Sequence, residues 1–381
     1  MDCLEFQYSN CLRQRLILST LTRRKIVIKN IRDNRNLNDF GLKKYEISLL
    51  ELLEKVTNSS TITIDESGTK IVYKPGILYG GEIEHFCDYE RSIGYYLEFL
   101  IPLAPFCKFP IEAKLHGITN DRIDPSVDTL KYSLESIKPF LVVASEDELQ
   151  IKIISRGLRP DGGGLIVFKC PIRKSLKSVH LIDPGKVKRI RGVAFAARVS
   201  PQMANRMVDT AKGLLLKLIP DIYIYTDCLR GKNSGKSPGF GISLTAETTE
   251  KSFYVGESVS NPPDKTKQEY SLPEDVARQA VNNLLNDIYR GGTINSNSQG
   301  LIATLMTFTN RDLSKVIFGP LTPYTIQLFN HIHQFTGLKF KLDVDEKEEK
   351  QSGGKKLQKG SKKIIAACVG IGYSNLSKIV K

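Results

Sequence analysis

The chain has 381 residues, of which 41% are hydrophobic and 25% are charged. This length suffices for two or three domains, and the hydrophobic content excludes a chain that is disordered as a whole. Lysine and arginine number 55 against 41 acidic residues, which gives a net charge of +14 and favours a polyanionic partner, whether RNA, an acidic protein or a membrane surface.

The sequence predicts neither a membrane span nor a secretion signal. No apolar run is long enough to cross a bilayer, and residues 1–5 are acidic rather than basic and then apolar. The seven cysteines form no Cys-x-x-Cys pair and no Cys/His spacing that suits zinc. We therefore expect reduced thiols in the cytosol or nucleus, and neither a metal nor another cofactor.

Hydrophobic periodicity predicts two similar series of elements in residues 1–184. In chain order they are a helix that begins at Leu12, a strand at 25–29, a helix at 38–56, strands at 61–65 and 70–73, a helix at 92–106, a strand at 111–115, a helix at 125–139, and strands at 149–154 and 165–168. Because the order of the first series recurs in the second, we expect an internal structural repeat.

The composition changes near residue 183, where helix breakers and basic residues begin a different series. Its elements are a strand at 193–199, a helix at 201–218, strands at 221–226 and 242–247, a polar loop at 258–271, helices at 272–289 and 300–308, a strand at 316–318, a helix at 322–337, a strand at 338–344, a charged loop at 345–363, and a strand at 364–369. The polar loop at 258–271 contains two adjacent prolines and has the composition of a linker.

Residues 156–166 join two predicted strands and contain two arginines, a proline and three consecutive glycines. Consecutive bare backbone N–H groups can hold an anion, and arginine adds a bidentate contact to phosphate. This composition predicts a phosphate or RNA-backbone site whose residues are Arg156, Arg159, Gly162, Gly163 and Gly164. The alternative is a flexible hairpin loop without a ligand.

The order Arg-Gly-x-x-Pro-x-Gly-Gly-Gly-x-Ile at 156–166 resembles the signature of the RNA 3′-terminal phosphate cyclase family. Residues 73–81 and 117–121 resemble other segments of that family. The similarity is greatest to its non-cyclase eukaryotic branch, and it rests on residues 199–206, 233–239 and 370–378. The resemblance runs almost from end to end.

The resemblance implies an α+β fold with a large domain of repeated β-α-β-α-β-β units. It implies that residues 185–271 form a smaller α/β domain inserted into the large one. The large domain then comprises residues 1–184 and 272–381, and the charged stretch at 345–363 is expected to be a mobile surface loop.

The chain departs from the family pattern at two active-site segments. Where the cyclases have a Glu-Gly-Gly-Gly-Gln loop, residues 6–10 read Phe-Gln-Tyr-Ser-Asn. The resemblance places Asn297 at the catalytic His, which becomes covalently adenylated in the family. No His occurs between His180 and His331, and an Asn amide has no titrating lone pair that can attack phosphorus. The sequence therefore predicts no cyclase activity and no catalytic residue.

Two other motifs were candidates for chemistry. Residues 233–237 resemble a phosphate-binding P-loop, but Arg230 stands where the motif needs glycine, so we expect a basic hairpin instead.

His331 and His333 resemble an acid–base pair for RNA cleavage. Residues two apart on a helix diverge by about 200°, so we expect one ring to be exposed and the other to be packed.

Asp121, Asp124 and Asp128 are the closest approach to a metal-ligand set in this sequence. Helix caps and turns explain carboxylates at such positions more simply. We therefore expect no metal site here.

Basic residues gather in three places, and a net-positive chain makes polyanion binding there more plausible. The clusters are Arg13, Arg15, Arg23, Arg24 and Lys25; Lys169, Arg173, Lys174 and Lys177; and Lys186, Lys188, Arg189 and Arg191. From these we expect Arg13, Lys186, Lys188, Arg189 and Arg191 to contact RNA.

The resemblance implies a nucleolar protein of the small-subunit processome, needed for early cleavages of pre-ribosomal RNA that lead to 18S rRNA. It implies pre-ribosomal RNA and a nucleolar ribosome-assembly GTPase as partners, without membrane association. One alternative is an RNA endonuclease that cuts pre-ribosomal RNA itself. An active ATP-dependent RNA 3′-phosphate cyclase is a further and less favoured alternative.

Overall fold

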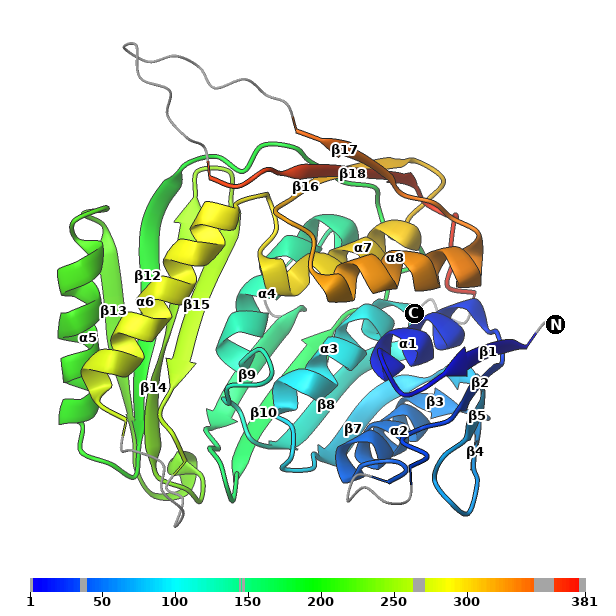
Figure 1. The fold of residues 1–381 in the computed structure, drawn as a ribbon, viewed down its shortest axis with the longest axis horizontal. Helices are drawn as coiled ribbons and strands as arrows, with labels where there is room; N and C mark the ends of the chain where they lie inside the picture. The colour runs from blue at the N-terminus through cyan, green and yellow to red at the C-terminus, as the bar shows by residue number, and fades with distance from the viewer. Residues whose placement is uncertain are drawn as a thin grey trace.

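The computed structural model describes residues 3–34, 40–143, 145, 148–262, 271–345 and 360–376. In this part of the chain a β-α-β-α-β-β unit occurs three times, and a fourth sheet is inserted in the third unit (Figure 1). The predicted fold class, a large α+β domain of repeated units with an inserted α/β segment, is therefore confirmed.

Each of the three units contributes a four-stranded sheet and the helices that cover it. The first consists of β1 (Leu4–Gln7), α1 (Leu12–Thr22), β2 (Ile26–Lys29), α2 (Lys44–Val56), β4 (Thr61–Ile64) and β5 (Ile71–Lys74), with a small ladder of β3 (Thr57–Asn58) and β6 (Ile77–Leu78). The second consists of β7 (Gly80–Phe86), α3 (Ile93–Leu103), β8 (Phe109–Gly117), α4 (Val127–Leu141), β9 (Gln150–Ser155) and β10 (Gly164–Cys170). The third consists of β11 (His180–Leu181), α7 (Gln299–Thr307), β16 (Leu313–Phe318), α8 (Pro323–Thr336), β17 (Lys341–Val344) and β18 (Ile364–Val369).

The three sheets share one topology. Their strand orders are β1-β2-β5-β4, β7-β8-β10-β9 and β11-β16-β18-β17. In each sheet the first two strands are parallel, and the other neighbours are antiparallel. This shared order confirms the internal repeat that was expected from the series of elements.

The inserted segment forms a sheet of order β13-β12-β14-β15. Its elements are β12 (Val187–Ala197), α5 (Gln202–Leu215), β13 (Ile222–Leu229), β14 (Gly239–Thr248), β15 (Phe253–Val259) and α6 (Pro273–Arg290). Helix α6 buries Val276, Ala280 and Leu284 in the same core as this sheet and α5. We therefore propose that the inserted unit extends to Arg290, beyond the boundary at residue 271 that the polar loop suggested.

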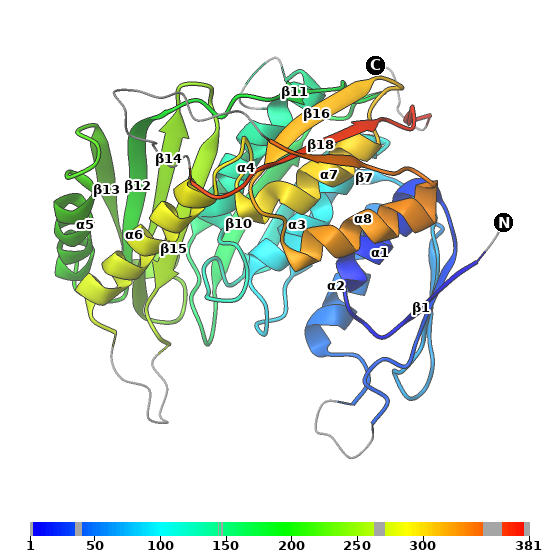
Figure 2. The ribbon, with the colours of Figure 1, turned by 45° about the horizontal axis from the view of Figure 1, so that its top comes forward.

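The helices of the three units meet in the middle of the large domain, with the sheets outside them (Figures 1 and 2). One continuous apolar core joins side chains from all three units, for example Leu16, Leu100 and Ile302. Burial of this core is the main stabilising term. The packed core also fixes the position of the loop before α4, beside the inserted sheet.

Six strands of the described residues were not predicted from the sequence, namely β1, β3, β6, β7, β11 and β15. In β15 the alternation is interrupted by Gly256 and Glu257, which are more typical of loops. The structure explains both residues. A Cβ on Gly256 would overlap the backbone of α6 at Leu284, and Glu257 is used to bind the start of α4.

The predicted mobile loop at 345–363 falls largely on residues 346–359, which lie outside the described residues. Within the described ranges, no helix is long and apolar enough to cross a membrane.

Candidate functional site

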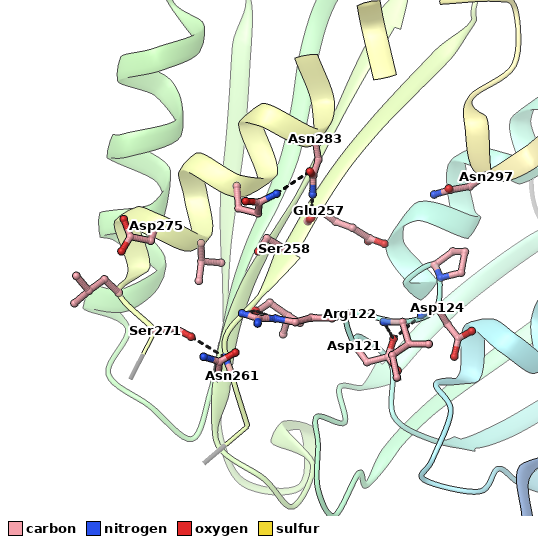
Figure 3. Close-up of a pocket in the computed structure, with 16 residues that line it drawn as sticks. Asp121, Arg122, Asp124, Glu257, Ser258, Asn261, Ser271, Asp275, Asn283 and Asn297 are labelled. Atoms are coloured by element: carbon pink, nitrogen blue, oxygen red, sulfur yellow. Dashed lines mark hydrogen bonds between the residues drawn. The ribbon is translucent and has the colours of Figure 1, made fainter. Parts of the chain in front are cut away.

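A cavity of about 680 Å³ opens between the large domain and the inserted sheet (Figure 3). The loop before α4 forms one side, and the end of β15 with the start of α6 forms the other. Its polar lining is mainly carboxylates and carboxamides, namely Asp121, Asp124, Glu257, Asp275, Asn261, Gln279, Asn283 and Asn297. Polar groups that converge in a cavity of this size are typical of a binding site.

Asn297 lies at this cavity, and its side chain is exposed. The resemblance places this residue at the family's catalytic His. None of the described residues that line the cavity is His, Cys or Lys. The described lining therefore presents the amide of Asn297 and no imidazole, thiol or amine that could act as a nucleophile.

The aspartates beside the cavity serve as turn and helix-start residues. Asp121 accepts hydrogen bonds from the N–H groups of Ile123 (3.0 Å) and Asp124 (2.8 Å). Asp124 accepts from Ser92 N–H (3.2 Å) and is bound by Arg91. These bonds give Asp121 the expected turn role, whereas Asp124 chiefly binds Arg91 and does not cap α4, whose N-cap is Ser126.

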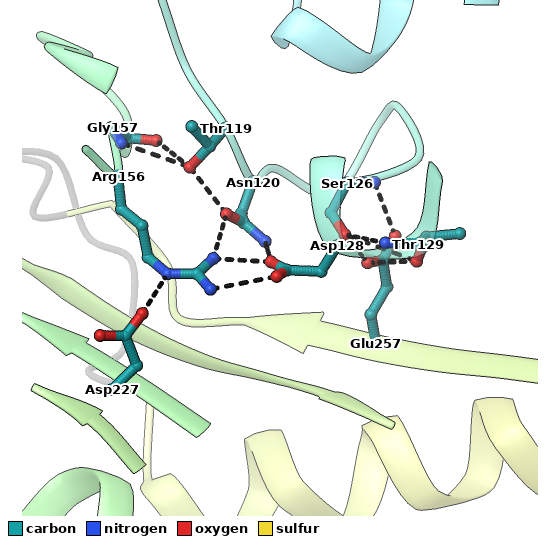
Figure 4. Close-up of polar contacts among 9 residues, drawn as sticks. All are labelled: Thr119, Asn120, Ser126, Asp128, Thr129, Arg156, Gly157, Asp227 and Glu257. Carbon is teal, nitrogen blue, oxygen red and sulfur yellow. Dashed lines mark hydrogen bonds and ion pairs between the residues drawn. The ribbon is translucent and has the colours of Figure 1, made fainter. Parts of the chain in front are cut away.

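Arg156 lies at the seam between the large domain and the inserted sheet (Figure 4). Its side chain is 3% exposed, and it binds Asp128 through two bonds of 2.6 and 3.0 Å and Asp227 of β13 at 2.9 Å. Burial alone would raise the pKa of Asp128, but the charge of Arg156 outweighs it and lowers that pKa to about 2. The expectation that Arg156 contacts RNA phosphate needs correction, because two protein carboxylates already neutralise this buried guanidinium.

Glu257 forms a second link across the seam (Figure 4). Its carboxylate accepts hydrogen bonds from Ser126 N–H (3.0 Å), from the Ser126 hydroxyl and from the Thr129 hydroxyl (2.8 Å). These donors sit at the N-terminus of α4, where a negative charge is favourable. Burial raises the pKa of Glu257, whereas the bonds from Ser126 and Thr129 lower it.

The glycine triplet packs against neighbouring backbone. Gly162 N–H donates to Leu158 C=O, and Gly162 C=O accepts from Lys236 N–H, both at 2.9 Å. A Cβ on Gly163 would meet Lys236 at 3.0 Å, and one on Gly164 would meet the backbone of an adjacent strand. The predicted cradle of bare donors is thus incomplete, because the first N–H is used inside the loop and the glycines permit close approach of other chain segments.

Arg159 and Arg13 are also engaged by the protein. Arg159 donates to Asp121 (3.1 Å) and to a backbone carbonyl, and its side chain is partly exposed. Arg13 is largely buried, binds Glu98 and stacks over the ring of Tyr95 at 4.4 Å. The structure therefore does not bring Arg13 into one site with Arg159 and the triplet, and a contact of Arg13 with RNA would require the loss of a buried ion pair.

The segment 186–191 begins the central strand β12, and both of its arginines are paired. Arg189 binds Glu247 at 2.7 Å, and Arg191 binds Asp221 through two bonds of 2.8 and 3.1 Å. Such solvent-accessible pairs contribute only about 0–1 kcal/mol. An RNA phosphate could therefore replace either carboxylate as the partner of its arginine with little loss of free energy.

Lys186 and Lys188 are exposed. Within the described ranges, neither forms an ion pair. They are consequently the members of the predicted RNA-binding set whose charges are least compensated.

Residues 233–237 join β13 to β14 and pack on the loop of the glycine triplet. The prediction of a hairpin is wrong, because β13 and β14 lie on either side of β12 and do not pair with each other. Ser237 Oγ accepts from Asp161 N–H at 2.9 Å, and Gly235 lies against the backbone of Arg156. The fold thus joins two motifs of the resemblance, far apart in sequence, at the seam.

The two histidines of α8 do not share a site. His331 is 1% exposed, its Nδ1 contacts Gln14 Oε1 at 2.9 Å, and Arg15 donates to its Nε2 at 3.4 Å. His333 is exposed. The predicted separation of the two rings is confirmed.

We predict that stability decreases between about pH 6.5 and pH 4 because of His331. Burial, with a contribution from Arg15, lowers the pKa of His331 to about 4, below the value of about 6.5 in an unfolded chain. Between these values the unfolded state binds more protons, so each unit by which the pH falls lowers the free energy of unfolding by up to about 1.4 kcal/mol.

Unfolding in urea, measured at pH 7 and pH 5, should show a smaller loss of stability in His331→Gln than in the unaltered protein. His333→Gln is the matched control and should leave the loss unchanged. Equal losses in all three proteins would contradict this account.

No local sequence pattern indicates which residues complete the seam. Asp227 lies 71 residues from Arg156, and Glu257 lies 131 residues from Ser126. Asp227 directly follows the strand predicted at 221–226, and Glu257 directly precedes the polar loop predicted at 258–271, so the sequence assigned neither residue to an element. Only the packing of the inserted sheet on α4 brings these residues together.

Comparison with known proteins identifies the family to which the chain belongs. Residues 4–342 match the sequence profile of RNA 3′-terminal phosphate cyclase. The human RNA 3′-terminal phosphate cyclase-like protein is 50% identical over 99% of this chain and 98% of its own. An rRNA processing protein of Schizosaccharomyces pombe is 36% identical over 99% of this chain and 98% of its own. The chain therefore belongs to the RNA 3′-terminal phosphate cyclase family.

Proposed function

We propose that the chain is a non-cyclase ribosome biogenesis factor that acts in rRNA processing. In the full proposal it works in the nucleolus as part of the small-subunit processome and is required for the early pre-rRNA cleavages that lead to 18S rRNA. The observation that carries the proposal is that Asn297 lines the cavity, because the resemblance places the catalytic His of the cyclases at this residue. The name of the 36% identical Schizosaccharomyces pombe relative supports the rRNA-processing role.

The contacts of the aspartates near the cavity support the proposal. Asp121, Asp124 and Asp128 each bind an arginine. General acid–base catalysis needs an ionisable group that is free to exchange a proton with a substrate. Because these carboxylates hold the protein together, they favour a binding role over the alternative of an endonuclease.

The proposed partners are pre-ribosomal RNA and a nucleolar ribosome-assembly GTPase. The net charge of +14 favours a polyanion. Lys186 and Lys188 are exposed on the inserted unit, where a phosphate backbone could reach them. The proposal needs no cofactor, because it assigns no chemical step to the chain.

The test is replacement of the Schizosaccharomyces pombe relative by this chain, with 18S rRNA and its precursors measured by hybridisation. The proposal predicts that the unaltered chain and Asn297→Ala both sustain normal 18S rRNA levels, because the amide has no chemical role. The human relative serves as the control for transfer between species. If the human protein sustains processing while this chain, present at equal level, does not, the proposed role is contradicted. Loss of processing in Asn297→Ala alone would instead point to chemistry at the cavity.

A further inference from the structure

Two exposed tyrosines lie side by side on the outermost strand of the inserted sheet. Tyr223 and Tyr225 belong to β13, and 62% and 52% of their surfaces are exposed. Residues two apart on a strand point to the same face. The alternate residue Ile224 packs into the core with α5 and α6. The tyrosines are therefore on the opposite face, and the strand is anchored without them.

Cations lie beside these rings on the neighbouring strand β12. Tyr223 pairs in register with Arg191, whose only carboxylate partner, among the described residues, is the exposed Asp221. Lys188 is exposed and close enough to Asp221 to help lower the pKa of that carboxylate, after the larger effect of Arg191. Tyr223 thus has a permanently charged guanidinium at the neighbouring strand position, and Lys188 lies near the carboxylate that pairs with this guanidinium.

A further cation lies on the large-domain side. Burial raises the pKa of Tyr225, and Asp128 and Asp227 add to the increase. Burial lowers the pKa of Lys131 on α4, whereas the same two aspartates raise it. Lys131 forms no ion pair with any described residue. Tyr225 and Lys131 therefore share Asp128, Arg156 and Asp227 as neighbours at the seam.

We propose that Tyr223 and Tyr225 form a stacking surface for two bases of single-stranded RNA, with Lys188 and Arg191 at the phosphates. Single-stranded RNA is bound by aromatic side chains on an open sheet face, next to cations that follow the backbone. Residues two apart on a strand are separated by about 7 Å, so each ring can take its own base. This inference rests on the proposed role in rRNA processing and names the surface that contacts the RNA.

Charge favours RNA over a protein as the ligand of this face. Arg191 is paired with Asp221 and Arg189 with Glu247, the charges of Arg156 and Lys131 balance those of Asp128 and Asp227, and Lys188 remains as excess positive charge. A basic and aromatic surface complements the negative backbone and the π-faces of RNA. The exposed edge of β13 also has the chemistry to pair with a strand of a partner protein, and the test below separates this outcome.

The test uses the full chain and a fluorescent oligouridine of about 12 nucleotides, within the site sizes of sheet-based single-strand binders. Replacing both tyrosines by Thr keeps a residue suited to a strand but removes the rings. Its affinity should fall by at least about 30-fold, which corresponds to about 1 kcal/mol at each ring. Replacing both tyrosines by Phe should change the affinity by less than about threefold, since the rings can still stack.

Two controls separate stacking from charge and from general surface effects. Tyr289→Ala removes a ring of 56% exposure on α6, which packs on the opposite face of the sheet, and should leave binding unchanged. Lys188→Gln should reduce the slope of log affinity against log salt by about 1. The Thr pair should keep the slope of the unaltered protein, because stacking displaces no counterions. Thermal unfolding should show the same midpoint for all variants.

Each other result overturns the inference. If the Thr pair binds oligouridine as tightly as the unaltered protein, the tyrosines are not part of the RNA surface, and the proposed RNA binding stands without them. If the unaltered protein does not bind the oligouridine, both the inference and the RNA binding within the proposed function fail. If the Phe pair loses as much affinity as the Thr pair, the hydroxyls act rather than the rings. If the Thr pair changes self-association in sedimentation but not RNA affinity, the face is an interface with a second copy.

Discussion

Replacing Asp128 by Asn lowers the free energy of unfolding by about 3–5 kcal/mol, the range for one partner removed from a buried ion pair. The side chain of Arg156 is 3% exposed and would keep its charge with Asp227 alone. The Asn amide fits the space but carries no negative charge to match the guanidinium. We expect this variant to be among the most destabilising single changes at the seam. Urea unfolding, followed by circular dichroism, measures the effect.

Asp221→Asn is the matched control for this prediction. It is the same chemical change in a carboxylate that also binds an arginine, but the Asp221 side chain is 52% exposed. Pairs of this kind are worth about 0–1 kcal/mol. If the two variants lose equal amounts of stability, the Arg156 site is not the buried electrostatic link described above.

Replacing Gly157 by Ala should destabilise the protein by about 3 kcal/mol, at the upper end for overpacking. A Cβ at this position would lie closer than 3.0 Å to the carbonyl of Gly117, the N–H group of Gly164 and the carbonyl carbon of Gly162. All three are backbone atoms held in the sheet or in the packed loop, so none can move as a flexible side chain would. The midpoint of thermal unfolding measures the effect.

Gly213→Ala provides the comparison for Gly157→Ala. Gly213 lies inside α5, and a Cβ there would meet no atom within 4 Å. Alanine is favoured over glycine in a helix by about 1 kcal/mol, so this variant should be slightly more stable than the unaltered protein. A Gly157→Ala protein that is equally stable would show that the loop at 156–163 has room to adjust.

Much of the fold could be predicted because its elements have strong periodicity. Helices such as α4 and α8 show an apolar stripe between a cap and a terminating residue, and β10 lies between clear turn signals. The repeated order of elements then indicated a repeated unit. Helix α6 was assigned to the large domain, although it packs on the inserted sheet. Its apolar stripe shows that it packs on a sheet but does not show which sheet.

The candidate site could be predicted only in part, because its contacts are long-range. The loop at 156–163 does lie beside the cavity, but the sequence could not show that Arg156 binds Asp128 and Asp227, which are 28 and 71 residues away. Arginine next to glycine has the same composition whether it binds a phosphate or a protein carboxylate. Burial decides between the two, and burial here depends on the packing of the inserted sheet.

The most direct test of the central claim, that the family scaffold acts here without cyclase chemistry, is a single incubation. Purified protein is mixed with ATP, Mg²⁺ and an RNA fragment that ends in a 3′-phosphate, and both the protein and the RNA are examined by mass spectrometry. We expect unmodified protein and an RNA of unchanged length and unchanged 3′-phosphate, because Asn297 offers no nucleophile at the cavity. An adenylyl group on the chain or a 2′,3′-cyclic phosphate on the RNA would contradict the account.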